Sequence, residues 1–160
     1  MTAEERTVQR DRMRYIKNSL SSNLAILGIL FDVFYFVSLY RSDVDTYYYN
    51  YMIGISIVYN LIFMLAVFLS SEGVKNYKKN YSYILAVIGA VQVARIFIIP
   101  MRAHAATAIV NNETVQVMGS GQFTWMVACL VISAGCLVAS AAVNFVRCNE
   151  LAEHLKTLEA

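Results

Sequence analysis

The pattern of hydrophobic and polar positions divides the chain into four long apolar stretches separated by polar segments. The apolar stretches cover residues 20–40, 48–70, 81–101 and 123–146. Each is as long as the roughly 20 residues that a helix needs to cross a ~30 Å hydrocarbon core. Helices that are apolar on all sides are surrounded by lipid or by other helices. The pattern therefore predicts an all-α integral membrane protein, a four-transmembrane-helix bundle in which residues 1–160 form a single membrane domain.

A soluble protein with four buried helices is the alternative interpretation. A chain of 160 residues is too short to surround four fully apolar helices with further helices. The composition points the same way, because 58% of the residues are hydrophobic and 15% are charged, whereas soluble domains carry about 25% charged residues. We also expect no cleaved signal peptide, because the first stretch is too long and follows a polar arm.

Basic residues are concentrated on one side of the predicted bundle. The side that holds both termini and the middle loop carries ten of them: Arg6, Arg10, Arg12, Arg14, Lys17, Lys75, Lys78, Lys79, Arg147 and Lys156. The other side carries only Arg41 and Arg102. Cytoplasmic loops hold the excess of Lys and Arg. We therefore expect a multi-pass plasma membrane protein whose two termini, including the tail at residues 147–160, are cytoplasmic.

The N-terminal arm, residues 1–19, is expected to form a short amphipathic helix. Arg6, Arg10 and Arg14 fall on one face at helical spacing, and Met13 and Ile16 fall on another. A basic amphipathic helix of this kind lies along an anionic membrane surface. Three roles remain open for it: an anchor that fixes the topology, a lipid sensor, or an arm that lines a pore.

Two features mark the opposite, outer side. Residues 47–51, with four tyrosines, predict an aromatic belt at the membrane interface; binding of sugars or cations by the ring faces is the alternative. The outer loop at residues 103–122 is the longest, and its segments 107–110 and 114–118 have the composition of a small β-hairpin. Asn112-Glu113-Thr114 also matches the pattern of a glycosylation acceptor.

Two charged residues lie inside the predicted helices, Asp32 in the first and Arg95 in the third. Each lies slightly past the midpoint of a helix that runs towards the outer side, so both are expected at a similar depth in the membrane. Left unpaired, the two charges would cost roughly 5–7 kcal/mol together on the insertion scale. We therefore predict an Asp32–Arg95 contact, because pairing removes most of this cost. The remaining hydrogen-bond positions of this candidate polar site are assigned to Gln92, Asn60 and Tyr59.

Three roles fit this pair. It is a structural pair that fixes the register of the helices, a gated pair that lines an aqueous or substrate path, or a pair in which one charge meets a partner subunit.

Small residues predict where helices approach closely. Ala86, Ala90 and Ala94 form a small-xxx-small ridge on the third stretch, and Gly28 lies on the Asp32 face of the first. A stripe on the fourth stretch contains Cys129, Ser133, Cys136, Ser140 and Asn144. We expect this stripe to serve close helix packing, with a conduction path as the alternative.

The chain also contains an apparent internal repeat. Residues 24–28 (LAILG) align with residues 85–89 (LAVIG), and residues 51–53 align with residues 125–127. These matches predict two duplicated helical hairpins related by a pseudo-two-fold axis along the membrane normal.

Signatures of catalysis are absent from the sequence. It has no metal-ligand spacing, no Cys-x-x-Cys, no phosphate-binding glycine loop and no nucleophile elbow. We therefore expect no enzyme, cofactor, metal site or nucleic-acid partner. The expected function is association in the lipid bilayer, as an accessory or scaffold subunit or as a homo-oligomer. The alternative is a small ion or solute channel or transporter that uses Asp32 and Arg95.

Overall fold

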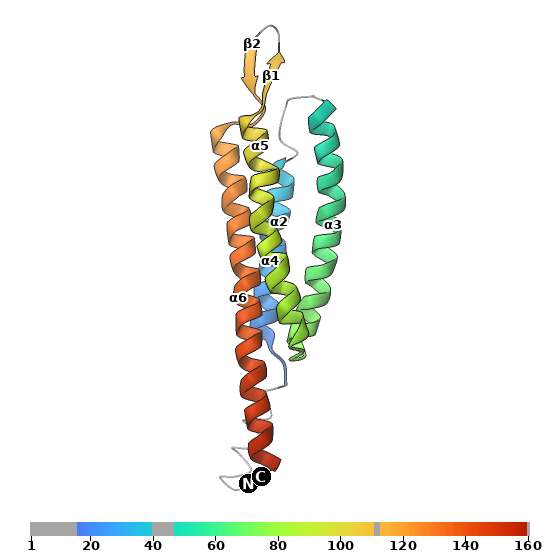
Figure 1. The fold of residues 1–160 in the computed structure, drawn as a ribbon, viewed down its shortest axis with the longest axis vertical. Coiled ribbons are helices and arrows are strands. Elements are labelled where there is room, and N and C mark those ends of the chain that lie inside the picture. Colours follow the sequence, from blue (N-terminus) through green and yellow to red (C-terminus); the bar gives the residue numbers. More distant parts are fainter. Residues whose placement is uncertain (1–15, 40–46, 111–112, 160) are drawn as a thin grey trace.

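The computed structural model describes residues 16–39, 47–110 and 113–159. Within these ranges the chain forms five helices and a two-stranded hairpin (Figure 1). The elements in chain order are α2 (Ser19–Leu39), α3 (Tyr47–Lys75), α4 (Asn80–Ile98), α5 (Pro100–Ala105), β1 (Thr107–Val110), β2 (Glu113–Gln116) and α6 (Ser120–Glu159).

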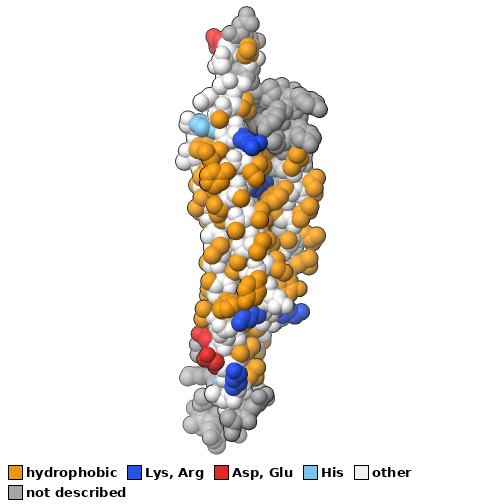
Figure 2. Space-filling model, in the orientation of Figure 1, with side chains coloured by type: hydrophobic (Ala, Val, Ile, Leu, Met, Phe, Trp, Pro, Cys, Tyr) orange, Lys and Arg blue, Asp and Glu red, His pale blue; other side chains and the backbone are white. Residues whose placement is uncertain are grey.

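Four of these helical segments are long and apolar enough to span a membrane: Ser19–Leu39, Gly54–Lys75, Asn80–Ala105 and Ser120–Thr157. They coincide with the four apolar stretches of the sequence, so the prediction of a helical protein with four such segments is confirmed. Figure 2 shows that hydrophobic side chains cover the middle of the visible face and that Lys and Arg side chains gather towards its two ends.

The observed helices differ from the predicted stretches at their ends. α3 continues to Lys75, and α6 continues to Glu159, well beyond the predicted end at residue 146. At 1.5 Å per residue the 40 residues of α6 extend about 60 Å, roughly twice the thickness of a hydrocarbon core. No Gly or Pro interrupts residues 137–159, and good helix formers such as Leu, Ala, Glu and Lys continue the helix.

The N-terminal arm lies mostly outside the described residues. Its described part, residues 16–18, is not helical, so the predicted arm helix does not run into α2. Asn18 instead caps α2, because its Oδ1 accepts a hydrogen bond from the backbone N–H of Ser21 at 3.4 Å. The side chains of the tyrosine cluster at residues 47–51 also lie outside the described part.

The predicted hairpin is present at the end of the bundle opposite Glu159 (Figure 1). β1 and β2 are antiparallel, with Thr107 opposite Gln116 and Val110 opposite Glu113. The second strand ends before the predicted residue 118, because Val117 and Met118 are buried against the bundle. The backbone carbonyl of Met118 lies 3.1 Å from His104 Nδ1, which ties the hairpin to α5.

The four long helices form a ring in which α2 and α4 each contact α3 and α6. Gly28 and Gly89, which the repeat aligns, both lie against α6. A Cβ at Gly28 would lie 3.0 Å from Leu137 Cδ2, and one at Gly89 would lie 2.9 Å from Val138 Cγ2. A two-fold axis that exchanges the hairpins would place one of these glycines against α3. The two hairpins therefore do not pack as equivalents at this position, contrary to the expected repeat.

Candidate functional site

Asp32 of α2 and Arg95 of α4 contact each other in the middle of the bundle. Arg95 Nη1 lies 3.0 Å from Asp32 Oδ1, and the two side chains are 4% and 1% exposed. The predicted contact between the first and third stretches is therefore present. Both groups need a partner there, because an isolated buried charge costs several kcal/mol.

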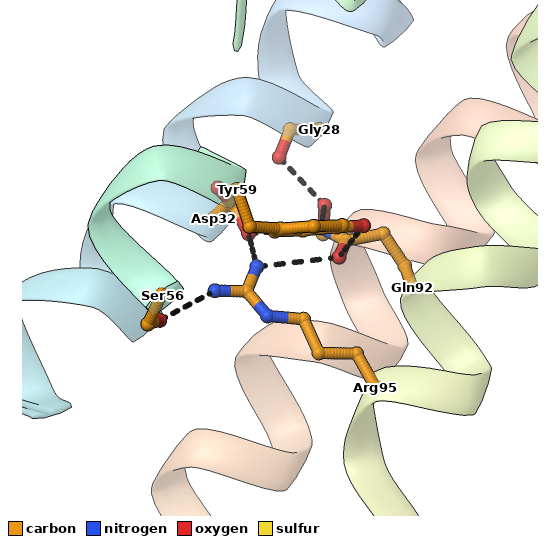
Figure 3. A network of polar contacts seen from close by, with 7 residues as sticks. Gly28, Asp32, Ser56, Tyr59, Gln92 and Arg95 are labelled. Carbon is orange, nitrogen blue, oxygen red and sulfur yellow. Dashed lines mark hydrogen bonds and ion pairs between the residues drawn. The ribbon is translucent and has the colours of Figure 1, made fainter. Parts of the chain in front are cut away.

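Gln92 and Ser133 connect this ion pair to α6. Gln92 Nε2 donates a hydrogen bond to Asp32 Oδ1 at 2.8 Å and lies 3.4 Å from Ser133 Oγ. Ser133 Oγ donates in turn to the backbone carbonyl of Gly28 at 2.8 Å. Figure 3 shows Asp32 of α2 and Gln92 of α4 beside the guanidinium of Arg95. The chain of bonds fixes the heights of three helices relative to one another.

The α3 side of the site is built from a hydroxyl and aromatic rings. Arg95 Nη2 donates to Ser56 Oγ at 3.1 Å. The guanidinium carbon lies 4.4 Å from the ring centroids of both Tyr35 and Tyr59, so two rings contact the cation. Such cation–π contacts contribute about 0.5–2 kcal/mol each. Tyr59 OH also lies 3.5 Å from Gln92 Oε1 (Figure 3). We define these seven residues as the polar centre: Asp32, Tyr35, Ser56, Tyr59, Gln92, Arg95 and Ser133.

Sequence reasoning missed Tyr35 and Ser56 as partners of the pair. Tyr35 follows Asp32 by three residues and therefore lies on the same helix face, which is a signal that spacing alone provides. Ser56 stands in the same relation to Tyr59, again three residues away.

Asn60 makes no hydrogen bond to the Asp32–Arg95 pair, contrary to the prediction. It is buried, yet neither Nδ2 nor Oδ1 has a hydrogen-bond partner within the described structure. The same holds for Asp32 Oδ2, Tyr35 OH and Arg95 Nε. An unpaired buried polar group costs about 1–3 kcal/mol. The polar centre thus combines an ion pair with polar atoms, two of them on the pair itself, that have no partner among the described residues.

A second layer of polar contacts lies towards the end of the bundle that holds the start of α2. Ser21 and Ser140 each donate to the other's backbone carbonyl at 2.6 Å. Asn144 of α6 accepts a hydrogen bond from Asn18 at 3.0 Å and donates to Ser82 of α4 at 2.7 Å. The polar stripe of the fourth stretch therefore makes bonds between helices, as the packing interpretation predicts. In that stripe Cys129 is buried and Cys136 is half-buried.

The alanine ridge does not pack against another helix of the described chain. Ala86, Ala90 and Ala94 are exposed on α4, whereas Gly89 and Gln92 face α6. The ridge therefore does not serve packing within the bundle, and the approach of a helix from another chain stays a prediction. The alanines are turned outward because Gln92 and Arg95 need polar partners inside the ring.

The arrangement offers little chemistry beyond hydrogen bonding and charge pairing. Among the described residues, no group of three or more His, Cys, Asp or Glu side chains could hold a metal ion. No family model matches the chain, and no curated protein or solved structure is significantly similar to it.

Proposed function

We propose that this chain is a multi-pass protein of the cell membrane, with both termini in the cytoplasm, and that it acts by association. Its partner is a second copy of the chain or another membrane subunit. The four long apolar helices support the insertion into a bilayer. The excess of Lys and Arg on the side of the termini supports the orientation.

In this proposal the polar centre is a structural element that makes the bundle rigid. It receives side chains from all four long helices, and all of them except the half-buried Tyr59 are buried. Buried polar networks specify one packing arrangement when their bonds require a single register. A rigid bundle then presents a constant outer surface to a partner.

The observation that carries the proposal is the outward direction of the alanine ridge. Ala86, Ala90 and Ala94 provide a line of small side chains on the exposed face of α4. Small residues let two membrane helices approach closely, and the bundle itself leaves this face unused. On α6, Gly135 is also exposed, and its surroundings are open.

The test replaces Ala90 with Leu and measures the oligomeric state by sedimentation equilibrium in a neutral detergent. The control is Gly54→Leu on α3, where an added side chain also meets open space. Overpacking a contact costs about 1–3 kcal/mol, so A90L should weaken self-association at least about fivefold while G54L leaves it unchanged. A wild-type chain that is monomeric at every concentration and cross-links to no subunit in its native membrane would refute the proposal.

A small ion or solute transporter is the second candidate, and the unpaired polar atoms favour it. Asp32 Oδ2, Arg95 Nε, Tyr35 OH and both polar atoms of Asn60 are buried without a partner in the described part of the chain. A transported ion or a proton could use such groups. Purified protein in vesicles should then conduct, and Asn60→Leu should abolish the flux without unfolding the chain. Flux no higher than that of protein-free vesicles would exclude this candidate.

A further inference from the structure

A cavity of about 440 Å³ opens between α3 and α4, next to the turn that joins them. Its apolar part is formed by Ala66, Leu69 and Ile84. Its polar part is formed by Glu72, Asn76 and Lys78. The volume lies in the range of about 300–1,000 Å³ that is typical of ligand sites.

The turn between the helices shapes this cavity. Gly73 lies directly against the ring of Tyr81, which a Cβ at that position would overlap. Tyr77 adopts a left-handed conformation with φ of 57°, and the backbone N–H of Lys78 then donates to the carbonyl of Gly73 at 3.1 Å. This turn follows the end of α3 at Lys75 and places Lys78 at the mouth of the cavity. The cavity is therefore a consequence of defined local geometry.

The charge at the mouth is positive. The single carboxylate there, Glu72, is paired with Lys75, whose Nζ lies 2.9 Å from Glu72 Oε1. Lys79 is directed to α6, where its Nζ donates to Asn149 Oδ1 at 3.0 Å. Lys78 is exposed and makes no ion pair within the described residues. A ligand in the cavity thus meets one ammonium group that has no carboxylate partner among the described residues.

We propose that this cavity binds one anionic phospholipid from the leaflet on the side of the termini. The phosphate lies at Lys78 and Asn76, and part of an acyl chain lies along Leu69 and Ile84, while the rest of the lipid remains in the bilayer. The apolar end continues into exposed hydrophobic surface, since Leu69 is 56% and Ile84 is 44% exposed. The order of apolar and basic groups therefore matches the order of chain and headgroup in a phospholipid. The inference relies on the membrane location in the proposed function and is independent of association.

The experiment uses native mass spectrometry of the full chain released from nanodiscs that contain equal amounts of phosphatidylglycerol and phosphatidylcholine. Both lipids have the same acyl chains, so only the headgroup differs. An additional lysine near a membrane surface contributes about 1 kcal/mol towards an anionic lipid, which corresponds to about fivefold preference. We expect phosphatidylglycerol to be retained at about this preference, and Lys78→Gln to remove the preference.

Ile84→Trp tests the apolar part of the cavity. Trp should fill it and reduce retention of both lipids, whereas Ile132→Trp on α6, where the wild-type side chain is 43% exposed, should not. Lys156→Gln, in the distal part of α6, is the matched control for charge. Equal retention of the two lipids by the wild type, or equal losses in the target and control variants, would overturn the proposal.

Two further readouts distinguish a lipid site from a site for phosphate alone and from an effect of association. Inorganic phosphate added at millimolar concentration should not displace the lipid; displacement would show a site for the phosphate group alone and would overturn the lipid assignment. The same spectra report the oligomeric state. A monomer that retains phosphatidylglycerol would refute self-association and leave the lipid site intact. An oligomer that retains both lipids equally would refute the lipid site and leave self-association intact.

Discussion

Removal of one charge of the buried pair should destabilise the bundle strongly. Arg95→Gln leaves Asp32 with the hydrogen bond from Gln92 at 2.8 Å as its remaining partner among those described. Loss of one partner of a buried pair costs about 3–5 kcal/mol, because the other charge stays buried. The contacts of the guanidinium with Tyr35 and Tyr59 are lost as well. Asp32→Asn should be comparably harmful, because it leaves the arginine uncompensated.

The double variant Asp32→Asn/Arg95→Gln decides whether the two side chains act as a pair. Two neutral amides can still bond to each other and to Gln92, so the double variant should be at least as stable as either single variant, with a coupling energy of at least about 2 kcal/mol. The assay is reversible unfolding in mixed micelles, followed by circular dichroism. Arg102→Gln is the control, because Arg102 is exposed and its change should stay within about 0.5 kcal/mol. Single variants that each cost less than about 1 kcal/mol, and that add in the double variant, would refute this reasoning.

Three further predictions concern other parts of the bundle. Gly28→Val should lower the free energy of unfolding by about 1–3 kcal/mol, because a Cβ at Gly28 would already lie 3.0 Å from Leu137 Cδ2. Gly135→Ala, in open surroundings, should leave the stability unchanged or raise it. Equal stabilities of the two variants would contradict the close approach of α2 and α6. Asn144→Leu should cost about 1–3 kcal/mol in the same assay, because Asn18 and Ser82 both lose a bond, and unchanged stability would show that this layer is dispensable. Cysteines placed at residues 113 and 156 should react with an impermeant maleimide from opposite faces of the membrane; labelling from the same face would reject the topology.

The polar centre can be predicted from the sequence because burial of charge is costly enough to leave few solutions. Asp32 and Arg95 lie at comparable positions in two apolar stretches, and a contact between them is the simplest way to avoid two unpaired charges. The partners around them are harder to identify. Ser56 and Asn60 lie one turn apart on α3, so a sequence without coordinates does not distinguish the side chain that reaches Arg95 from the one that does not.

The length of α6 cannot be inferred from hydropathy. Hydropathy locates the apolar part of a helix and gives no signal for a polar continuation, so the sequence predicts residues 147–159 only as a tail. The hairpin, in contrast, is predictable because its two short β-prone segments flank a turn-forming pair of asparagines. Its predicted second strand extends too far along the chain, because Met118 is taken up by the core instead.

The rotation of α4 explains why a small-residue pattern gives an incomplete prediction of packing. A small-xxx-small ridge favours close approach to another helix, but it does not state whether that helix belongs to the same chain. On α4 the alanine ridge and the set Gly89, Gln92 and Arg95 lie on different faces, and only one of these faces can point into the bundle. The polar side chains decide the outcome, because exposing them to lipid would cost several kcal/mol while exposing an alanine costs almost nothing. Because Gln92 and Arg95 face inward, the alanine ridge lies on the outer surface of the bundle. The two polar residues that hold the bundle together therefore also determine the surface by which we expect it to associate.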